Sequence, residues 1–292
     1  MQLHVQTVPH MQTGFSLPDK AVPDLIARLA ASAAVRLVSV VLFGGLTRGE
    51  WALATSDIDL VCLLEHEVDG SVRIALDAIY DGIEAEDPDA YKPLYVYHMP
   101  VESLRYPQFR AAGGPVGLRV GNHKRPMFNG FPMSVYDAYD IRHFGRTLYG
   151  PDLRGEFPAV TLDDLKAMTL HDLTNAATRH YEIGLPMGSN DAMDVTSTWN
   201  YVAWLCRALY SVSHSGQIMA KGLAMEWAKG IMPGWTPLLD VVLLLRFSPD
   251  NATPEHLQIL KVGFGAFFEE TARLITDALA GGISSPCLGR LD

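Results

Sequence analysis

The feature that most constrains the fold is a pair of glycines, Gly44-Gly45, followed after eleven residues by Asp57-Ile58-Asp59. The run Arg36–Phe43 before the glycines is apolar and rich in β-branched residues, which is typical of a buried strand. A second apolar run, Ile58–Leu64, predicts the next buried strand. Because glycine lacks a Cβ atom, the backbone after the first strand can turn sharply and approach a ligand closely. The sequence therefore predicts a strand, a tight glycine turn, a loop and a second strand.

The two aspartates are expected to lie on one face of the second strand, because side chains alternate along a strand and Ile58 points the other way. Carboxylates held so close repel each other unless a cation lies between them. Mg²⁺ prefers oxygen ligands and commonly bridges carboxylates to phosphates. Backbone amides at a glycine turn suit phosphate oxygens. The pattern, with Ser56 beside it, indicates a metal-triphosphate site, and the simpler alternative is a strand end that happens to be acidic.

The glycine pair, the spacing and the D-x-D motif resemble the signature of the polymerase-β-like nucleotidyltransferases. The segment His143–Pro151 resembles the one that closes the catalytic domain of the streptomycin/spectinomycin adenylyltransferases. Farther along, Leu205–Tyr210, Gly216–Lys221 and Glu226–Ala228 resemble segments of the helical domain of that family. This resemblance covers nearly the whole chain and implies an α+β fold. In that fold, an N-terminal nucleotidyltransferase domain with a mixed β-sheet and helices precedes a C-terminal α-helical bundle.

The resemblance also implies a reaction, the transfer of AMP from Mg-ATP to a hydroxyl of an aminoglycoside or aminocyclitol-like molecule. Asp57 and Asp59 match the catalytic pair that binds Mg²⁺. The residues that match the ATP-binding positions are Gly44, Gly45, Thr47 and Ser56 in the first domain and Arg207 and Lys221 in the second. Phe247 stands where the family has a tyrosine near the nucleotide, and a place in the core explains it equally well.

One departure concerns the general base. The family places a glutamate on the strand after the D-x-D motif, and Tyr95 occupies that position here. A phenol with a pKa near 10 is a poor base at neutral pH. His98 has a suitable pKa range but should point to the opposite face of its strand. The other nearby candidates are Glu102 beyond the strand and an acidic run before it, interpreted as a solvated loop, with Glu84, Glu86, Asp87 and Asp89.

A second departure concerns the acceptor. The streptomycin-modifying members have a tryptophan in the region that matches 108–125, and this chain has none there. Ser197 replaces an aspartate of the family, although Asp194 lies one helical turn earlier. Both differences argue against streptomycin itself as the acceptor.

Composition excludes several other classes of protein. The chain has 292 residues, is 48% hydrophobic and carries a net charge of −10, divided evenly between its halves. It has no basic stripe for nucleic acid, and the short cluster His123-Lys124-Arg125 is interpreted as a solvated loop. An acidic protein attracts a polycationic substrate over long range. Cys62 and Cys206 lie in apolar runs and, without a C-x-x-C or H-E-x-x-H motif, do not indicate zinc. Without an apparent signal peptide or membrane span, we expect a cytoplasmic protein.

The domain boundary is expected near Phe157-Pro158, which gives a nucleotidyltransferase domain over 1–157 and a helical substrate- and nucleotide-binding domain over 158–292, with a ligand cleft between them. The Gly- and Pro-rich stretch 105–134 is expected to be irregular. Predicted strands are 36–43, 58–64 and 91–99, and predicted helices are 23–34, 71–81, 134–144, 161–182, 194–214, 219–230, 236–246 and 254–280.

Three functions stay open on this basis. The first is adenylyl transfer to an aminoglycoside-like small molecule. The second keeps the fold and the metal pair but transfers AMP to a protein or to a biosynthetic intermediate. The third is a non-catalytic nucleotide-binding regulator, which the tyrosine at position 95 suggests because the general base is missing.

Overall fold

The computed structural model describes residues 13–52, 55–91, 93–105, 116–120, 128–183 and 195–281. Its contacts divide the chain into two compact units. The first runs to Trp51 and resumes over Ser56–Val160, and the second contains Ala52–Thr55 and the chain from Thr161 onward.

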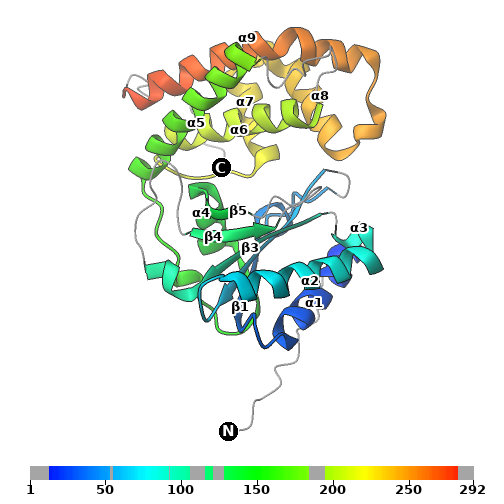
Figure 1. Cartoon of the computed structure of the whole chain (residues 1–292). Coiled ribbons are helices and arrows are strands. Elements are labelled where there is room, and N and C mark those ends of the chain that lie inside the picture. Colours follow the sequence, from blue (N-terminus) through cyan, green and yellow to red (C-terminus); the bar gives the residue numbers. More distant parts are fainter. Residues whose placement is uncertain are drawn as a thin grey trace. The chain divides into compact units, whose positions relative to one another are not determined.

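The first unit contains a mixed sheet in the order β5-β4-β3-β2-β1-β6. Strands β2 and β3 are parallel, and every other neighbouring pair is antiparallel. The central strands are so uniformly apolar because helices cover both of their faces (Figure 1). The strands are β1 Leu37–Phe43, β2 Ile58–Leu64, β3 Leu94–Pro100, β4 Val116–Val120, β5 Phe128–Pro132 and β6 Arg146–Tyr149.

The two faces of this sheet belong to different hydrophobic clusters. Helices α1 (Ser16–Ala31) and α2 (Gly70–Glu86), with the short helix α3 (Pro88–Tyr91), pack on the face that carries Ile58 and Leu60. Helix α4 (Val135–Phe144) packs on the other face, which carries Val61. Strand alternation therefore assigns every residue of β2 and β3 to the α1/α2 face or to the α4 face.

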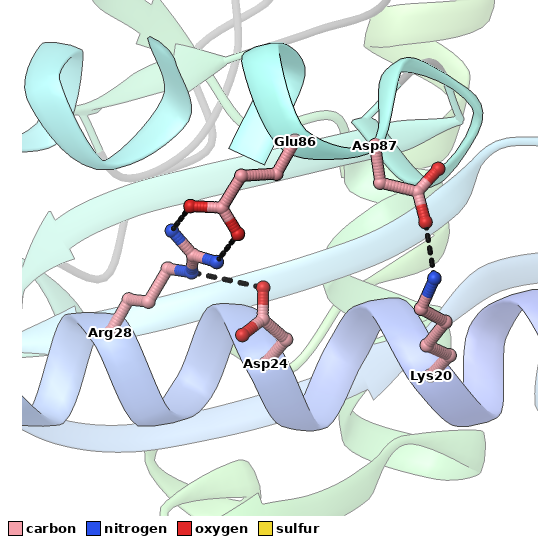
Figure 2. A network of polar contacts seen from close by, with 5 residues as sticks. All are labelled: Lys20, Asp24, Arg28, Glu86 and Asp87. Carbon is pink, nitrogen blue, oxygen red and sulfur yellow. Dashed lines mark hydrogen bonds and ion pairs between the residues drawn. The ribbon is translucent and has the colours of Figure 1, made fainter. Parts of the chain in front are cut away.

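An exposed network of ion pairs joins α1 to the end of α2 (Figure 2). The Arg28 guanidinium donates two hydrogen bonds to Glu86, at 3.1 and 2.6 Å, and a third to Asp24 at 2.9 Å. The same pairing lowers the pKa of Glu86. Lys20 pairs with Asp87 at 2.5 Å. Exposed pairs of this kind contribute little to stability individually. Together they show that Glu86 and Asp87 serve as partners of α1.

The second unit is helical, and its core is built from apolar residues of several helices, among them Leu205, Val242 and Phe264. The last helix starts with a capping box, in which the Thr253 hydroxyl accepts a hydrogen bond from the His256 amide, and has Pro254 at its first position. The helices of this unit are α5 Leu162–Ile183, α6 Val195–Ser213, α7 Lys221–Ile231, α8 Thr236–Phe247 and α9 Pro254–Leu279. Within the described residues, none of the helices combines the length and apolarity needed to cross a membrane.

The predicted α+β fold class is confirmed, with corrections to individual elements. The first helix begins at Ser16, so Pro23 lies inside it rather than at its start. Helix α2 continues to Glu86, so the acidic run is mostly helical and not a loop. The strand expected over 91–99 starts only at Leu94. The stretch 105–134 contains β4 and β5, and sheet pairing rather than a strong apolar pattern makes these short glycine-containing segments strands.

Candidate active site

The glycine turn and the D-x-D motif meet at one end of β1 and β2. Phe43, the last residue of β1, is the register partner of Asp59. Gly44 then opens a short 3₁₀ turn, Gly44–Leu46, with a φ of +73°. A Cβ atom on Gly44 would lie 2.1 Å from the Asp59 Oδ2 atom. The Asp59 carboxylate therefore occupies the space that only glycine leaves free, which explains why this position requires glycine.

The loop after the turn is held by its own polar groups. The Thr47 hydroxyl donates to the Gly44 carbonyl at 3.0 Å, and the Glu50 amide donates to the Gly45 carbonyl at 2.9 Å. The indole nitrogen of Trp51 donates to the Asp57 carbonyl at 3.1 Å. Trp51 is buried, so its hydrogen bond ties the loop to the start of the aspartate motif. Trp51 was not predicted from the sequence, because no local pattern marks a buried indole that bonds to the backbone.

The aspartate pair fits a hard divalent cation. Asp57 and Asp59 flank Ile58, which is fully buried on the α1/α2 face, so alternation directs both carboxylates toward the α4 face. Both residues are partly exposed and so accessible to a ligand. In the described part of the chain, no three His, Cys, Asp or Glu side chains gather closely enough to hold a metal ion by themselves. A magnesium ion here would take its other ligands from water and phosphate, as Mg²⁺ usually does.

Tyr95 lies directly beside Asp59, because the two residues are register partners on the parallel strands β3 and β2. Neighbouring register partners point to the same face, and Tyr95 packs against the α4-side cluster that contains Val61 and Tyr97. A tyrosine therefore lies next to the aspartate motif, at the position where the sequence resemblance led us to expect a glutamate.

The substitutes considered from the sequence lie elsewhere. His98 is buried on the α1/α2 face, where its Nε2 atom lies 3.1 Å from the Tyr80 hydroxyl. Glu102 follows the far end of β3, which lies about 16 Å from Tyr95 at ~3.3 Å per residue. The acidic run over 84–89 belongs to the α2 and α3 side of the sheet. His98 and the acidic run lie on the other side of the sheet from Asp59, and Glu102 lies beyond the far end of β3.

Helix α4 supplies acidic groups that the sequence analysis did not select. Asp137 accepts a hydrogen bond of 2.9 Å from the Tyr97 hydroxyl. Burial, and next the charge of Asp137, raise the pKa of Tyr97 far above its ordinary value. One turn later Asp140 binds Arg48 of the glycine loop at 2.7 Å, and both side chains are at most one-tenth exposed. The signal available in the sequence was the i, i+3 spacing of the two aspartates, which places them on one face of a helix.

The second unit gathers cations around Trp199 of α6. Lys221, the first residue of α7, has its Nζ atom 3.3 Å from the Asn200 side-chain oxygen and 5.6 Å from the centre of the Trp199 ring. The buried guanidinium of Arg246 lies 5.7 Å from the same ring. The Arg246 carbonyl accepts a 2.5 Å hydrogen bond from Thr55. Trp199, Asn200 and Arg246 were not selected from the sequence, because they come together only when α6, α7 and α8 pack.

The remaining predicted residues lie in several parts of the chain. Arg207 donates from Nε to the Met219 carbonyl at 2.9 Å, so the backbone before α7 is one of its partners. Phe247 is half exposed, which rules out a place in the core. Asp194, the cluster His123-Lys124-Arg125 and most of 108–125 lie outside the described residues, as does the side chain of Ser197.

Comparisons with known proteins identify a domain match in the first unit and a similar fold. Residues 27–107 match the family model described as a nucleotidyltransferase domain. No curated protein sequence matches the chain. Among solved structures, spectinomycin adenyltransferase AAD(9) from Enterococcus faecalis, determined with ATP and spectinomycin, is similar with a TM-score of 0.62. It is 13% identical, and the match covers 88% of this chain and 98% of that one. Residues 27–107 therefore match a nucleotidyltransferase domain, the chain shares the fold of AAD(9), and the resemblance found in the sequence is confirmed at the level of this domain and this fold.

Proposed function

We propose that the protein transfers AMP from Mg-ATP to a hydroxyl group of a small aminoglycoside- or aminocyclitol-like molecule. The observation that carries this proposal is the Asp59 carboxylate in the space that Gly44 leaves free at the end of β1, with Asp57 immediately before β2. The nucleotidyltransferase domain match includes these residues, and AAD(9) was determined with ATP and an aminocyclitol antibiotic.

Each residue then has a chemical task. Asp57 and Asp59 would hold Mg²⁺, and the ion would neutralise charge on the triphosphate and on the departing pyrophosphate. The glycine turn would let backbone amides of Gly44 and Gly45 approach the phosphate oxygens, with Thr47 fixing the turn through its bond to the Gly44 carbonyl. Ser56, next to the aspartates, is proposed to take part in the same loop.

The helical unit is proposed to supply the remaining nucleotide contacts. Lys221 stands with Asn200 and Trp199 at the start of a helix, in a position suited to bind phosphate as a point charge. Arg207 is proposed to line the same site from α6. The net charge of −10 favours a cationic acceptor through long-range attraction.

The test is release of pyrophosphate from ATP over a panel of aminoglycosides and aminocyclitols, with the adenylylated product identified by mass spectrometry. We expect Asp59→Asn to lower kcat at least about a hundredfold, because a metal ion stabilises transition-state charge by several kcal/mol. Asp89→Asn, an exposed carboxylate of α3, is the matched control and should leave the rate unchanged. Wild-type activity that survives Asp59→Asn would contradict the assignment of the metal pair.

Other acceptors are a second possibility, because the substrate positions depart from the streptomycin-modifying pattern. A product that carries AMP on a protein or on a biosynthetic intermediate, found by mass spectrometry of a lysate incubated with ATP, would favour that function. A non-catalytic nucleotide-binding protein is favoured by Tyr95 beside Asp59. Calorimetry that shows Mg-ATP binding while no panel compound and no lysate component is modified would support this third function.

A further inference from the structure

We infer that Tyr95, Tyr97 and Asp137 form a proton relay that replaces the missing carboxylate base, with Asp137 as the final proton acceptor. This inference rests on the proposed adenylyl transfer and names residues that carry its proton. It starts from Tyr95, the register partner of Asp59 on the α4 face of the sheet. A phenol is a weak base alone, so its neighbours decide whether it can accept a proton.

The three groups form a continuous hydrogen-bonded chain. The Tyr95 hydroxyl lies 3.5 Å from the Tyr97 hydroxyl, and the Tyr97 hydroxyl donates to Asp137 Oδ2 at 2.9 Å. A tyrosine hydroxyl has one hydrogen to donate. Because Tyr97 gives its hydrogen to Asp137, Tyr95 is the donor in the contact between the two tyrosines. The lone pairs of the Tyr95 oxygen can then accept a hydrogen bond from a substrate hydroxyl.

The surroundings keep each group in the protonation state that the relay needs. Burial and the nearby carboxylate raise the pKa of Tyr97, so this phenol stays protonated and remains a donor. Asp137 lies in the first turn of α4, whose N-terminus favours negative charge. Other charged groups on this face are Asp57 just before β2, Asp59 on β2 and the Arg48–Asp140 pair, which α4 holds one turn farther along. Arg48 pairs with Asp140, and Asp137 accepts the hydrogen of the Tyr97 hydroxyl.

The proton balance of the step is simple. The acceptor hydroxyl oxygen forms a bond to the α-phosphorus of ATP while the bond from that phosphorus to pyrophosphate breaks. The hydroxyl proton passes to the Tyr95 oxygen, the Tyr95 proton to the Tyr97 oxygen, and the Tyr97 proton to the Asp137 carboxylate. Pyrophosphate leaves with the bonding electron pair, and Asp137 later returns its proton to solvent. Tyr95 is the catalytic residue, since it meets the substrate, and Tyr97 and Asp137 are positioning residues that act through it.

The test measures kcat, KM for ATP and the solvent isotope effect for Tyr95→Phe, Tyr97→Phe and Asp137→Asn. Each variant should lower kcat, by about 10²–10⁴-fold if the relay supplies the whole general-base effect, while KM for ATP stays within about twofold of wild type. The double variant Tyr97→Phe/Asp137→Asn should have a kcat no lower than that of the slower single variant, because the two substitutions interrupt the same proton pathway. For wild type, the dependence of kcat on the fraction of D₂O in the solvent should indicate that more than one proton moves in the transition state. Asp137→Glu, which keeps a carboxylate, should recover part of the kcat that Asp137→Asn loses.

Tyr80→Phe is the matched control. It removes a buried tyrosine hydroxyl on the opposite face of the sheet, where Tyr80 contacts His98, and should leave kcat unchanged. Thermal unfolding verifies that each variant is folded, and Tyr97→Phe carries the test if Asp137→Asn does not fold. If the wild-type protein is active and Tyr97→Phe leaves kcat unchanged, the relay is contradicted but the proposed function is not. Wild type that modifies no acceptor overturns the proposed function and the relay together.

Discussion

At the scale of single residues, Gly44 is the position where one added carbon should have the largest effect on activity. Gly44→Ala would drive a methyl group to within 2.1 Å of Asp59 Oδ2 and displace the carboxylate. Gly49, in the same loop, is the matched control, because its φ of +72° is nearly identical and no atom lies within 4 Å of an added Cβ. Both variants should lose about 1–2 kcal/mol of unfolding free energy from the left-handed backbone. Only Gly44→Ala should lose most of its AMP transfer, and equal activity of the two variants would contradict the contact.

The residue scale also separates what the sequence could predict from what it could not. Tyr95 was placed beside the aspartates correctly, because adjacent parallel strands bring their motifs into register. Asp137 was not selected, because its partner Tyr97 is forty residues away in the chain and no local spacing connects them. Tyr97 and Asp137 come together because α4 packs on the sheet. That packing depends on contacts throughout the first unit, so a local sequence pattern does not reveal it.

At the scale of elements, the Arg48–Asp140 pair attaches the glycine loop to α4. The Arg48 guanidinium also lies 4.1 Å from the centre of the Phe144 ring. Arg48→Met should lower the unfolding free energy by about 3–5 kcal/mol, because it leaves the carboxylate of Asp140 buried without this partner. The double variant Arg48→Met/Asp140→Leu should recover most of that loss, since an apolar pair of similar volume replaces a buried ion pair at little cost. Urea unfolding measures the unfolding free energy of the single and the double variant. A double variant no more stable than Arg48→Met would contradict the account in which the buried charge of Asp140 causes the loss.

The elements also show which patterns carry structural information. The strands over 37–43 and 58–64 were predicted nearly to the residue, because continuous apolar runs are buried on both faces. Strands β4 and β5 were missed, because Gly117 and Gly130 interrupt short segments near the edge of the sheet. The start of α1 was placed too late, because Pro23 was interpreted as a first helical residue although the helix already begins at Ser16.

At the scale of the whole molecule, each unit, taken by itself, contains residues that are proposed to bind the nucleotide. The first unit holds Asp59 against the glycine turn, and the second holds Lys221 beside Trp199 and Asn200. The motif spacing singled out Asp59 and the glycine turn, whereas Trp199 and Arg246 were not selected, because they come from helices whose packing the sequence pattern does not define. If the residues proposed in the two units bind the same nucleotide, variants in either unit should weaken ATP binding.

The most direct test is titration calorimetry of ATP into the full chain, with and without Mg²⁺. The expected result is one ATP per chain, bound in a magnesium-dependent manner. We expect Asp59→Asn and Lys221→Met each to weaken binding at least about tenfold, or about 1.4 kcal/mol, while Asp89→Asn binds as wild type does. ATP affinity that is the same with and without Mg²⁺, and the same in Asp59→Asn as in wild type, would contradict the assignment of the Gly44 turn and the aspartate pair as the metal-triphosphate site.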